Sequence, residues 1–249
     1  TTLFRSMRTP RIFEPDLVEA GLTFNVTKSN AHYLTTVLRL SIGDNVVIFT
    51  GLGGEYLCEI IEVKKKFVRV EVRYFNPIER ESDLRIHLGI GVSRGASMDF
   101  LVQKTTELGV DTITPLLARR SEVRVSAARL EKKLVHWQQI AVAACRQSLR
   151  NRIPKLANPK TVNDWITGLN EQARFVLDPR AKKTVNTFTK TGNSVSLLVG
   201  PESGLDEEEI KNTESANFHK INLGPRILRA ETAPIAAISI LQSMWGDMK

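Results

Sequence analysis

The sequence lacks long apolar runs and has little cysteine. No run of about eighteen apolar residues occurs, and the first fifteen residues are too polar for a signal peptide, so we expect a soluble, cytoplasmic protein without membrane contact. Cys58 and Cys145 lie far apart, and neither has a His or Cys at metal-ligand spacing. The four histidines show no ligand spacing either. We therefore expect no metal site and interpret both cysteines as small core residues.

What the sequence has in excess is positive charge. Its 249 residues carry 35 Lys and Arg against 27 Asp and Glu, a formal net charge of +8. Such a balance favours a polyanionic partner through phosphate contacts and counterion release, although plain solubility also explains it. Many of the arginines cluster in loop-like positions: Arg5, Arg8 and Arg11; Arg119, Arg120 and Arg124; Arg146, Arg150 and Arg152.

Hydrophobic periodicity divides the chain into two halves. Residues 1–75 contain β-like runs at 45–49, 55–63 and 66–75 and one helical pattern at 29–40, which together predict a small barrel with a helix. Residues 76–83 carry Pro and charge without periodicity and are typical of a linker. From residue 84 onward, strand-like runs alternate with helical patterns, which predicts an α/β domain with a mostly parallel sheet.

The expected elements of the second half follow one another closely. The strands are expected at 84–92, 110–117, 174–179, 195–200 and 219–224, and the helices at about 98–108 and 127–149, and from about Asp206 and Thr232. In such sheets, ligands bind outside the carboxyl ends of the strands. Two of these ends are followed by Gly-Pro pairs, in "LLVGPESG" (197–204) and "LGPRILRAETAP" (223–234).

The residues of these two loops restrict what they can bind. The sequence has no "GxxxxGK[ST]", and its glycine cluster "GLGG" (51–54) reads as a hairpin turn. Asp206 and Glu209 have capping-box spacing, and carboxylates at that helix start disfavour a phosphate there. Gly200 and Pro201 are then left to meet a less anionic ligand.

In the second loop, Arg226 and Arg229 lie beside Glu231 at the start of a helix. Thr232 can cap this helix, and Pro234 fits its first turn. A ligand site and a structural salt bridge both suit this arrangement.

Several motifs in one order resemble a known family. The stretches "LLVGPESGLDEEEI" (197–210) and "INLGPRILRAETAPIAAISILQ" (221–242) resemble the paired cofactor loops of the small-subunit ribosomal RNA uridine N3-methyltransferases (RsmE type), a branch of the SPOUT methyltransferases. The similarity extends over nearly the whole chain. It includes "MRTPRIFEP" (7–15), "VLRLSIGD" (37–44), "SRGASMDFLVQKTTELGVDTITPL" (93–116) and "WQQIAVAACRQSLRNRIP" (137–154).

The resemblance implies two domains with separate roles and a homodimer. It implies a PUA-like RNA-binding barrel over 1–75 and a SPOUT methyltransferase domain with a trefoil knot over 76–249. It further implies a homodimer that methylates 16S ribosomal RNA in the small subunit. In the last helix, a face of small and apolar residues is consistent with a subunit contact and equally with intrachain core: Ala233, Ala236, Ala237, Ile240, Leu241 and Met244.

The resemblance also implies S-adenosylmethionine as the cofactor, held largely by backbone groups of three loops and without a metal. The corresponding residues here are Leu177 and Asp178, Gly200 and Glu202, and Leu223, Gly224, Ile227 and Leu228. This sequence departs from the usual "GPEGG" by placing Ser203 at the first Gly of the final pair. We expect Ser203 to have a negative φ and the backbone constraint to fall on Gly200 and Gly204.

The methylated atom, uridine N3, carries a proton that must be removed. Glu231 is our candidate for the base, directly or through water, and Arg229 for stabilising negative charge on the uracil carbonyl oxygens. An Arg229–Glu231 pair that only shapes the loop is an equal alternative. Arg8, Arg11, Arg119 and Arg120 are candidate RNA phosphate contacts, with solvated surface charge as the alternative reading.

Two other functions remain compatible with the sequence. One is a ribosome-binding or assembly protein that keeps the fold without the chemistry, since binding alone would explain the basic charge. The other is a SPOUT methyltransferase that acts on tRNA or on a ribose 2′-oxygen.

Overall fold

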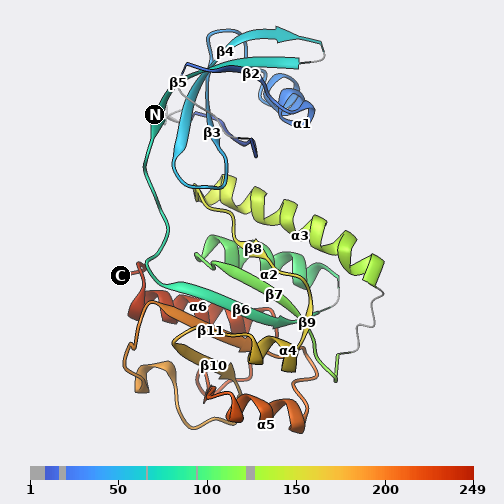
Figure 1. Ribbon diagram of the computed structural model, residues 1–249, viewed down its shortest axis with the longest axis vertical. Coiled ribbons are helices and arrows are strands. Elements are labelled where there is room, and N and C mark those ends of the chain that lie inside the picture. Colours follow the sequence, from blue (N-terminus) through green and yellow to red (C-terminus); the bar gives the residue numbers. More distant parts are fainter. Residues whose placement is uncertain (1–8, 17–20, 66, 94, 122–126) are drawn as a thin grey trace, which may run out of the picture. The chain divides into compact units, whose positions relative to one another are not determined.

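The computed structural model describes residues 9–16, 21–65, 67–93, 95–121 and 127–249 (Figure 1). The chain forms two compact units. The first comprises Thr1–Glu81 together with Cys145–Ile153, and the second comprises Ser82–Ala144 and Pro154–Lys249. The first unit thus extends past the expected boundary after residue 75 and takes in a second, distant segment.

In its described part, the first unit contains a five-stranded sheet in the order β1-β3-β4-β5-β2. Its strands are β1 (Arg11–Phe13), β2 (Thr23–Asn25), β3 (Asn45–Phe49), β4 (Glu55–Lys64) and β5 (Phe67–Asn76). β1 pairs with β3 in parallel, and the other pairings are antiparallel. The expected strands β3 to β5 are confirmed, whereas β1 and β2 are too short for periodicity to reveal.

A helical segment covers the core of this unit. It consists of α1 (Lys28–His32) and a π-helical turn, η1 (Tyr33–Val37), where the sequence predicted one continuous helix. Ala31 and Leu34 point into a core of strand residues that includes Ile48, Ile60 and Val70.

Arg11 fixes the segment Cys145–Ile153 within the first unit. Its guanidinium donates to the Cys145 carbonyl oxygen at 2.8 Å, to the Arg150 carbonyl oxygen at 2.8 Å and to Asn151 Oδ1. The side chain is only 6% exposed, and burial lowers its pKa. The prediction that Arg11 contacts RNA phosphates is therefore wrong, because these carbonyl oxygens already occupy its donors.

The neighbouring charges of this unit are also paired within the chain. Arg150 is buried, and its Nε lies 3.1 Å from both carboxylate oxygens of Glu81, while Arg152 Nε lies 3.3 Å from Glu79. The expected linker is thus tied down by two acidic residues. Cys58 and Cys145 are free and buried, as predicted.

The described part of the second unit contains a seven-stranded sheet in which all pairings are parallel. The strands are β6 (Arg85–Gly91), β7 (Thr112–Leu117), β8 (Lys155–Leu156), β9 (Lys160–Thr161), β10 (Ala173–Leu177), β11 (Ser194–Val199) and β12 (His219–Ile221). Their order is β12-β10-β11-β6-β7-β8, and β9 also pairs with β7. The predicted α/β class with a parallel sheet is confirmed.

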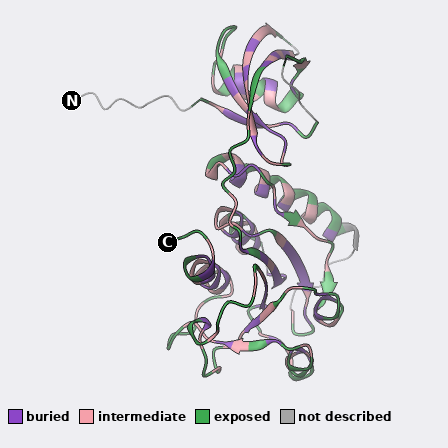
Figure 2. Cartoon of the chain, turned by 60° about the vertical axis from the view of Figure 1, so that its left-hand side comes forward, coloured by how far each residue is buried: buried purple, intermediate pink, exposed green. Residues whose placement is uncertain are grey.

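The helices of this unit alternate with the strands. They are α2 (Ala96–Glu107), α3 (Ala127–Ser148), α4 (Val162–Thr167), a 3-10 turn η2 (Val185–Thr187), α5 (Glu207–Ser215) and α6 (Thr232–Trp245). The end of α3, from Cys145 onward, belongs to the first unit. Figure 2 shows that the strands of the sheet are mostly buried, whereas the helices keep exposed sides. Among the described residues, no helix is long and apolar enough to cross a membrane.

The register of the sheet brings three loops to one edge. Leu177 of β10 pairs with Ile221 of β12, and Val176 pairs with Leu198 of β11. Because the strands are parallel, the segments that follow β10, β11 and β12 leave the sheet at the same end. Leu177 at the end of β10 and these segments together account for all eight predicted cofactor residues.

Candidate functional site

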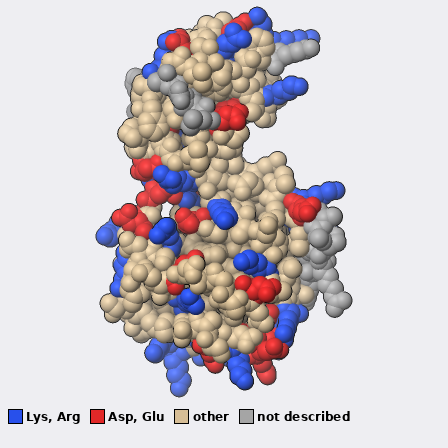
Figure 3. All heavy atoms as spheres, viewed as in Figure 1, with Lys and Arg blue, Asp and Glu red and all other residues tan. Residues whose placement is uncertain are grey.

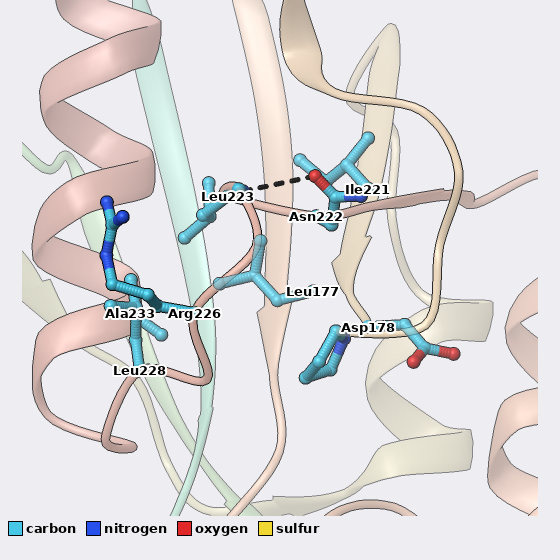
Figure 4. A pocket seen from close by; sticks show the side chains of 10 residues that line it. Leu177, Asp178, Ile221, Asn222, Leu223, Arg226, Leu228 and Ala233 are labelled. Carbon is cyan, nitrogen blue, oxygen red and sulfur yellow. Dashed lines mark hydrogen bonds between the residues drawn. The ribbon is translucent and has the colours of Figure 1, made fainter.

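A cavity of about 460 Å³ lies at this edge, and a smaller one of about 50 Å³ adjoins it. The two share Leu177, Asp178, Pro179, Leu228 and Ala233. All eight predicted cofactor residues line one or both cavities: Leu177, Asp178, Gly200, Glu202, Leu223, Gly224, Ile227 and Leu228. Figure 4 shows the smaller cavity; in this view Leu177 lies between Asp178 and the residues Leu223 and Leu228.

Close packing between β6 and the loop after β11 shapes the larger cavity. A Cβ atom on Gly91 would lie 2.4 Å from the Pro201 nitrogen and 2.9 Å from the Gly200 carbonyl carbon. Pro201 accepts a hydrogen bond from the Gly204 N–H at 2.8 Å, which closes a tight turn. Gly91 therefore allows this turn to approach the sheet, a role that the sequence reading missed.

The backbone of this turn agrees with the expectation for Ser203. Gly204 has a φ of +74°, whereas Ser203 does not belong to the described non-glycine residues with positive φ. Gly200 does not need a left-handed conformation, but a Cβ atom there would lie 3.3 Å from Leu205. The constraint at Gly204 is therefore conformational, and that at Gly200 is one of space.

Asn222 holds the loop after β12, and the sequence reading missed it. Its Oδ1 accepts from the Gly224 N–H at 3.1 Å (Figure 4), and its Nδ2 donates to the Ala181 carbonyl oxygen at 2.5 Å. Gly224 has a φ of +106°. The only sequence signal was an Asn that directly follows a strand, which is common in turns.

Asp178 lines both cavities, but its carboxylate serves the loop after β10. It accepts hydrogen bonds from Arg180 N at 2.9 Å and from Arg180 Nε at 3.1 Å. Burial acts to raise the pKa of Asp178, and the hydrogen bonds from Arg180 outweigh it and lower the pKa. In Figure 4, the carboxylate points away from Leu223 and Leu228.

The N-terminus of α5 is capped as predicted. Asp206 Oδ1 accepts from Glu209 N at 2.7 Å, and Glu209 Oε2 accepts from Asp206 N at 2.9 Å, which completes a capping box. Glu209 is buried, and its other oxygen accepts from Arg119 N at 2.9 Å. The carboxylates of Asp206 and Glu209 thus accept hydrogen bonds from backbone N–H groups of two segments, the start of α5 and the loop after β7.

The candidate phosphate contacts of this unit differ in their surroundings. The Arg119 guanidinium pairs with Glu208 and lies 3.5 Å from Asp206. Arg120 is exposed and lines the larger cavity. Arg8, Arg5 and Arg124 lie outside the described residues.

The candidate catalytic pair lies beside the cavity and does not line it. Arg229 is 86% exposed, and its Nη1 lies 3.9 Å from Glu231 Oε1, whereas Glu231 is 25% exposed. Ala230, between them, does line the cavity. The salt bridge is therefore loose, and neither side chain is locked by it.

The predicted cap of α6 is wrong. Thr232 is the first helical residue, and Glu231 occupies the N-cap position without a side-chain cap. The Thr232 and Ala233 N–H groups donate to the Arg229 carbonyl oxygen at 3.0 and 2.9 Å. A backbone turn thus takes the place of a side-chain cap.

The chain matches two known domain families and several known proteins. Residues 80–242 match the RNA methyltransferase domain family, and residues 26–73 match the RNA methyltransferase PUA domain family. Ribosomal RNA small subunit methyltransferase E of Buchnera aphidicola (subsp. Acyrthosiphon pisum) is 34% identical over 252 residues, which covers 100% of this chain and 99% of that protein. The enzyme of that name from Bacillus subtilis is 29% identical and covers 90% and 91%.

Two solved structures share the fold over almost their full length. Ribosomal RNA small subunit methyltransferase E from Neisseria gonorrhoeae, bound to S-adenosyl methionine, has a TM-score of 0.92 at 30% identity and covers 97% of this chain and 100% of that one. A Legionella pneumophila structure with bound SAM has a TM-score of 0.93 at 36% identity and covers 96% and 99%. With its PUA and methyltransferase domains matched, this chain belongs to the ribosomal RNA small subunit methyltransferase E family.

Proposed function

We propose that this protein transfers the methyl group of S-adenosylmethionine to N3 of a uridine in 16S ribosomal RNA of the small subunit. The observation that carries the proposal is the cavity formed by the loops after β10, β11 and β12. The family membership and the SAM bound in two relatives support the same function.

The residues present fit this cofactor. The larger cavity, about 460 Å³, lies within the range of small-molecule sites, roughly 300–1,000 Å³. Its walls combine Gly200, Gly204 and Pro201 with the apolar side chains of Leu177 and Leu228. Glycine allows a ligand to approach the backbone closely, so we propose that backbone N–H and C=O groups hold the adenine and methionyl parts.

We assign the cofactor contacts to the eight residues that line the cavities. Leu177 ends β10 and Asp178 follows it, and Gly200 and Glu202 follow β11. The loop after β12 contributes the other four: Leu223, Gly224, Ile227 and Leu228. When bound, S-adenosylmethionine supplies an already activated methyl group, so we propose that no metal takes part.

The remaining chemical task is to remove the N3 proton of uridine. We propose Glu231 as the base, directly or through water, and Arg229 as the group that stabilises charge on the uracil oxygens. Both lie next to Ala230 at the edge of the cavity. Their loose 3.9 Å contact leaves the side chains able to turn toward a bound base.

The RNA must present an unpaired or flipped uridine, because pairing in a duplex hides N3. We propose Arg8, Arg119 and Arg120 as phosphate contacts, Arg119 in competition with Glu208. On the face seen in Figure 3, basic and acidic side chains lie side by side over the second unit. On this face, single arginines are therefore better candidates than a broad basic patch.

We also propose a homodimer in the cytoplasm and, from the resemblance, a knotted second domain. The expected dimer face of α6 divides into two sets. Ala237 and Leu241 are buried within the chain, whereas Ala233, Ala236 and Ile240 are partly exposed and Met244 is 36% exposed. Only the second set is available to a partner subunit.

A methyl-transfer assay on defined RNAs tests this function. The purified protein, labelled S-adenosylmethionine and EDTA are incubated with naked 16S RNA, small subunits or tRNA, and the nucleosides are separated. We expect 3-methyluridine in the ribosomal RNA alone. Label in tRNA or on ribose would favour the alternative methyltransferase, and binding of the RNA without any transfer would favour an assembly protein.

A further inference from the structure

The turn at residues 201–204 lines the larger cavity and is called the cavity turn below. Ser203 joins this turn to the segment that follows β7. Its Oγ donates a hydrogen bond of 2.6 Å to the carbonyl oxygen of Arg120. One residue earlier, Arg119 N donates to Glu209 Oε1 at 2.9 Å. Two consecutive residues of this segment are thus fastened to the loop after β11 and to the start of α5.

The two hydrogen bonds differ in how firmly the side chains of Glu209 and Ser203 are held. Glu209 is buried and is fixed by the capping box of α5, so its bond to Arg119 is set by the fold. Ser203 is exposed and supplies a single hydroxyl. Removal of that hydroxyl takes away the hydrogen bond to the Arg120 carbonyl oxygen, whereas the flanking Arg119 and Ser121 keep their bonds to Glu209 and to the Ala118 and Val92 carbonyl oxygens.

Arg120 differs from the other basic residues that line the cavity. Arg180 is bonded to Asp178, and Lys220 is bonded to Glu214. Within the described part of the chain, no ion pair joins the side chain of Arg120. The planar guanidinium of such an arginine is suited to bidentate contact with a phosphate.

We infer that Ser203 is a positioning residue, which holds the backbone of Arg120 so that this arginine meets a phosphate beside the target uridine. The inference rests on the proposed function, since it takes RNA as the substrate. A base that enters the cavity brings the phosphates of its own nucleotide and its neighbour to the rim. Arg120 follows β7, outside the three loops that we assign to the cofactor, which favours the RNA phosphate over the cofactor carboxylate.

A double-mutant cycle tests the coupling between Ser203 and Arg120. Arg120→Ala should raise the KM for RNA about tenfold and reduce the salt dependence of RNA binding by about one unit of slope. Ser203→Ala should raise the KM about fivefold, which corresponds to about 1 kcal/mol for one hydrogen bond. In the Arg120→Ala background, Ser203→Ala should add less than about twofold, because its effect runs through Arg120.

Three controls separate positioning from general damage. Ser203→Thr keeps a hydroxyl and should recover most of the loss. Ser215→Ala removes a hydroxyl that donates to Lys211 O of its own helix, and it should leave the KM unchanged. The Kd for S-adenosylmethionine and kcat should stay within about twofold for Ser203→Ala.

Different contrary results would contradict different parts of the proposal. Equal losses from Ser203→Ala in both backgrounds would show that Ser203 does not act through Arg120. A weaker cofactor Kd in Arg120→Ala would assign the arginine to the cofactor carboxylate. If the wild-type protein transfers no methyl group, the proposed function fails, and the same cycle measured by RNA-binding anisotropy still decides the coupling.

Discussion

Gly91 and Pro201 are in such close contact that a Cβ atom at position 91 would lie 2.4 Å from the Pro201 nitrogen. Contacts this short do not occur, so any side chain at Gly91 must displace the turn that lines the cavity. The end of β6 and the loop after β11 are thereby linked, although 110 residues separate them in the chain.

Gly91→Ala is therefore expected to weaken cofactor binding at least tenfold and to destabilise the fold by about 1–3 kcal/mol, the usual cost of overpacking. Calorimetry with S-adenosylmethionine and thermal unfolding would measure the two effects. Gly168→Ala is the matched control, because a Cβ atom there would make only ordinary contacts of 3.6 Å or more. A Gly91→Ala protein with normal affinity would show that the turn can move without cost.

Two substitutions in the loop after β11 should differ strongly in their effect on cofactor binding. Gly200→Val should abolish cofactor binding, because it fills space in the cavity and meets Leu205. Ser203→Gly should change the cofactor Kd by less than about tenfold, since Ser203 does not have positive φ and carries no strain to relieve. A large gain in affinity from Ser203→Gly would contradict this description of the turn.

Glu231→Gln and Arg229→Ala test the chemistry. If Glu231 removes the N3 proton, or Arg229 stabilises the anion, each substitution should lower kcat about a hundredfold while cofactor binding and folding persist. Glu131→Gln, exposed on α3, is the control for loss of one carboxylate. Losses of tenfold or less would assign the pair to the shape of the loop.

A polar cluster of Trp165 in α4, His87 and Glu171 predicts a pH dependence of stability. Trp165 Nε1 donates to His87 Nε2 at 3.0 Å, and His87 Nδ1 lies 2.9 Å from Glu171 Oε1. This hydrogen bond from His87 lowers the pKa of Glu171 to about 2. A lowered folded-state pKa stabilises the fold above the unfolded value, about 4.5, and this stabilisation is lost as the pH falls toward 2.

Glu171→Gln should accordingly cost on the order of 2 kcal/mol of unfolding free energy at pH 7 and progressively less below pH 4.5. Urea unfolding at pH 7, 5 and 3 would measure the difference from the wild-type protein. A difference that stays constant over this range would show that the charge of Glu171 does not contribute.

The sequence predicted the long elements well, and the three loops that we propose for the cofactor lie together around the cavities. Alternating and helical periodicities located β3 to β7, α2 and α3 to within a few residues, because buried faces repeat regularly. The Gly-Pro pairs marked the ends of buried strands, and the capping-box spacing of Asp206 and Glu209 located the start of α5.

What the sequence could not reveal depends on contacts between distant segments. Arg11 resembled a surface arginine because its partners, Cys145 and Arg150, are more than 130 residues away. For the same reason, the membership of Cys145–Ile153 in the first unit could not be predicted. The strands β8 and β9 have two residues each, too few for any periodicity.

The central claim is that this chain makes 3-methyluridine in small-subunit ribosomal RNA. Its most direct test is nucleoside mass spectrometry of that RNA from a strain that lacks the gene, with and without a plasmid copy. We expect 3-methyluridine to disappear from the deletion strain, to return with the wild-type copy and not to return with Gly200→Val. An unchanged level of 3-methyluridine in the deletion strain would contradict it.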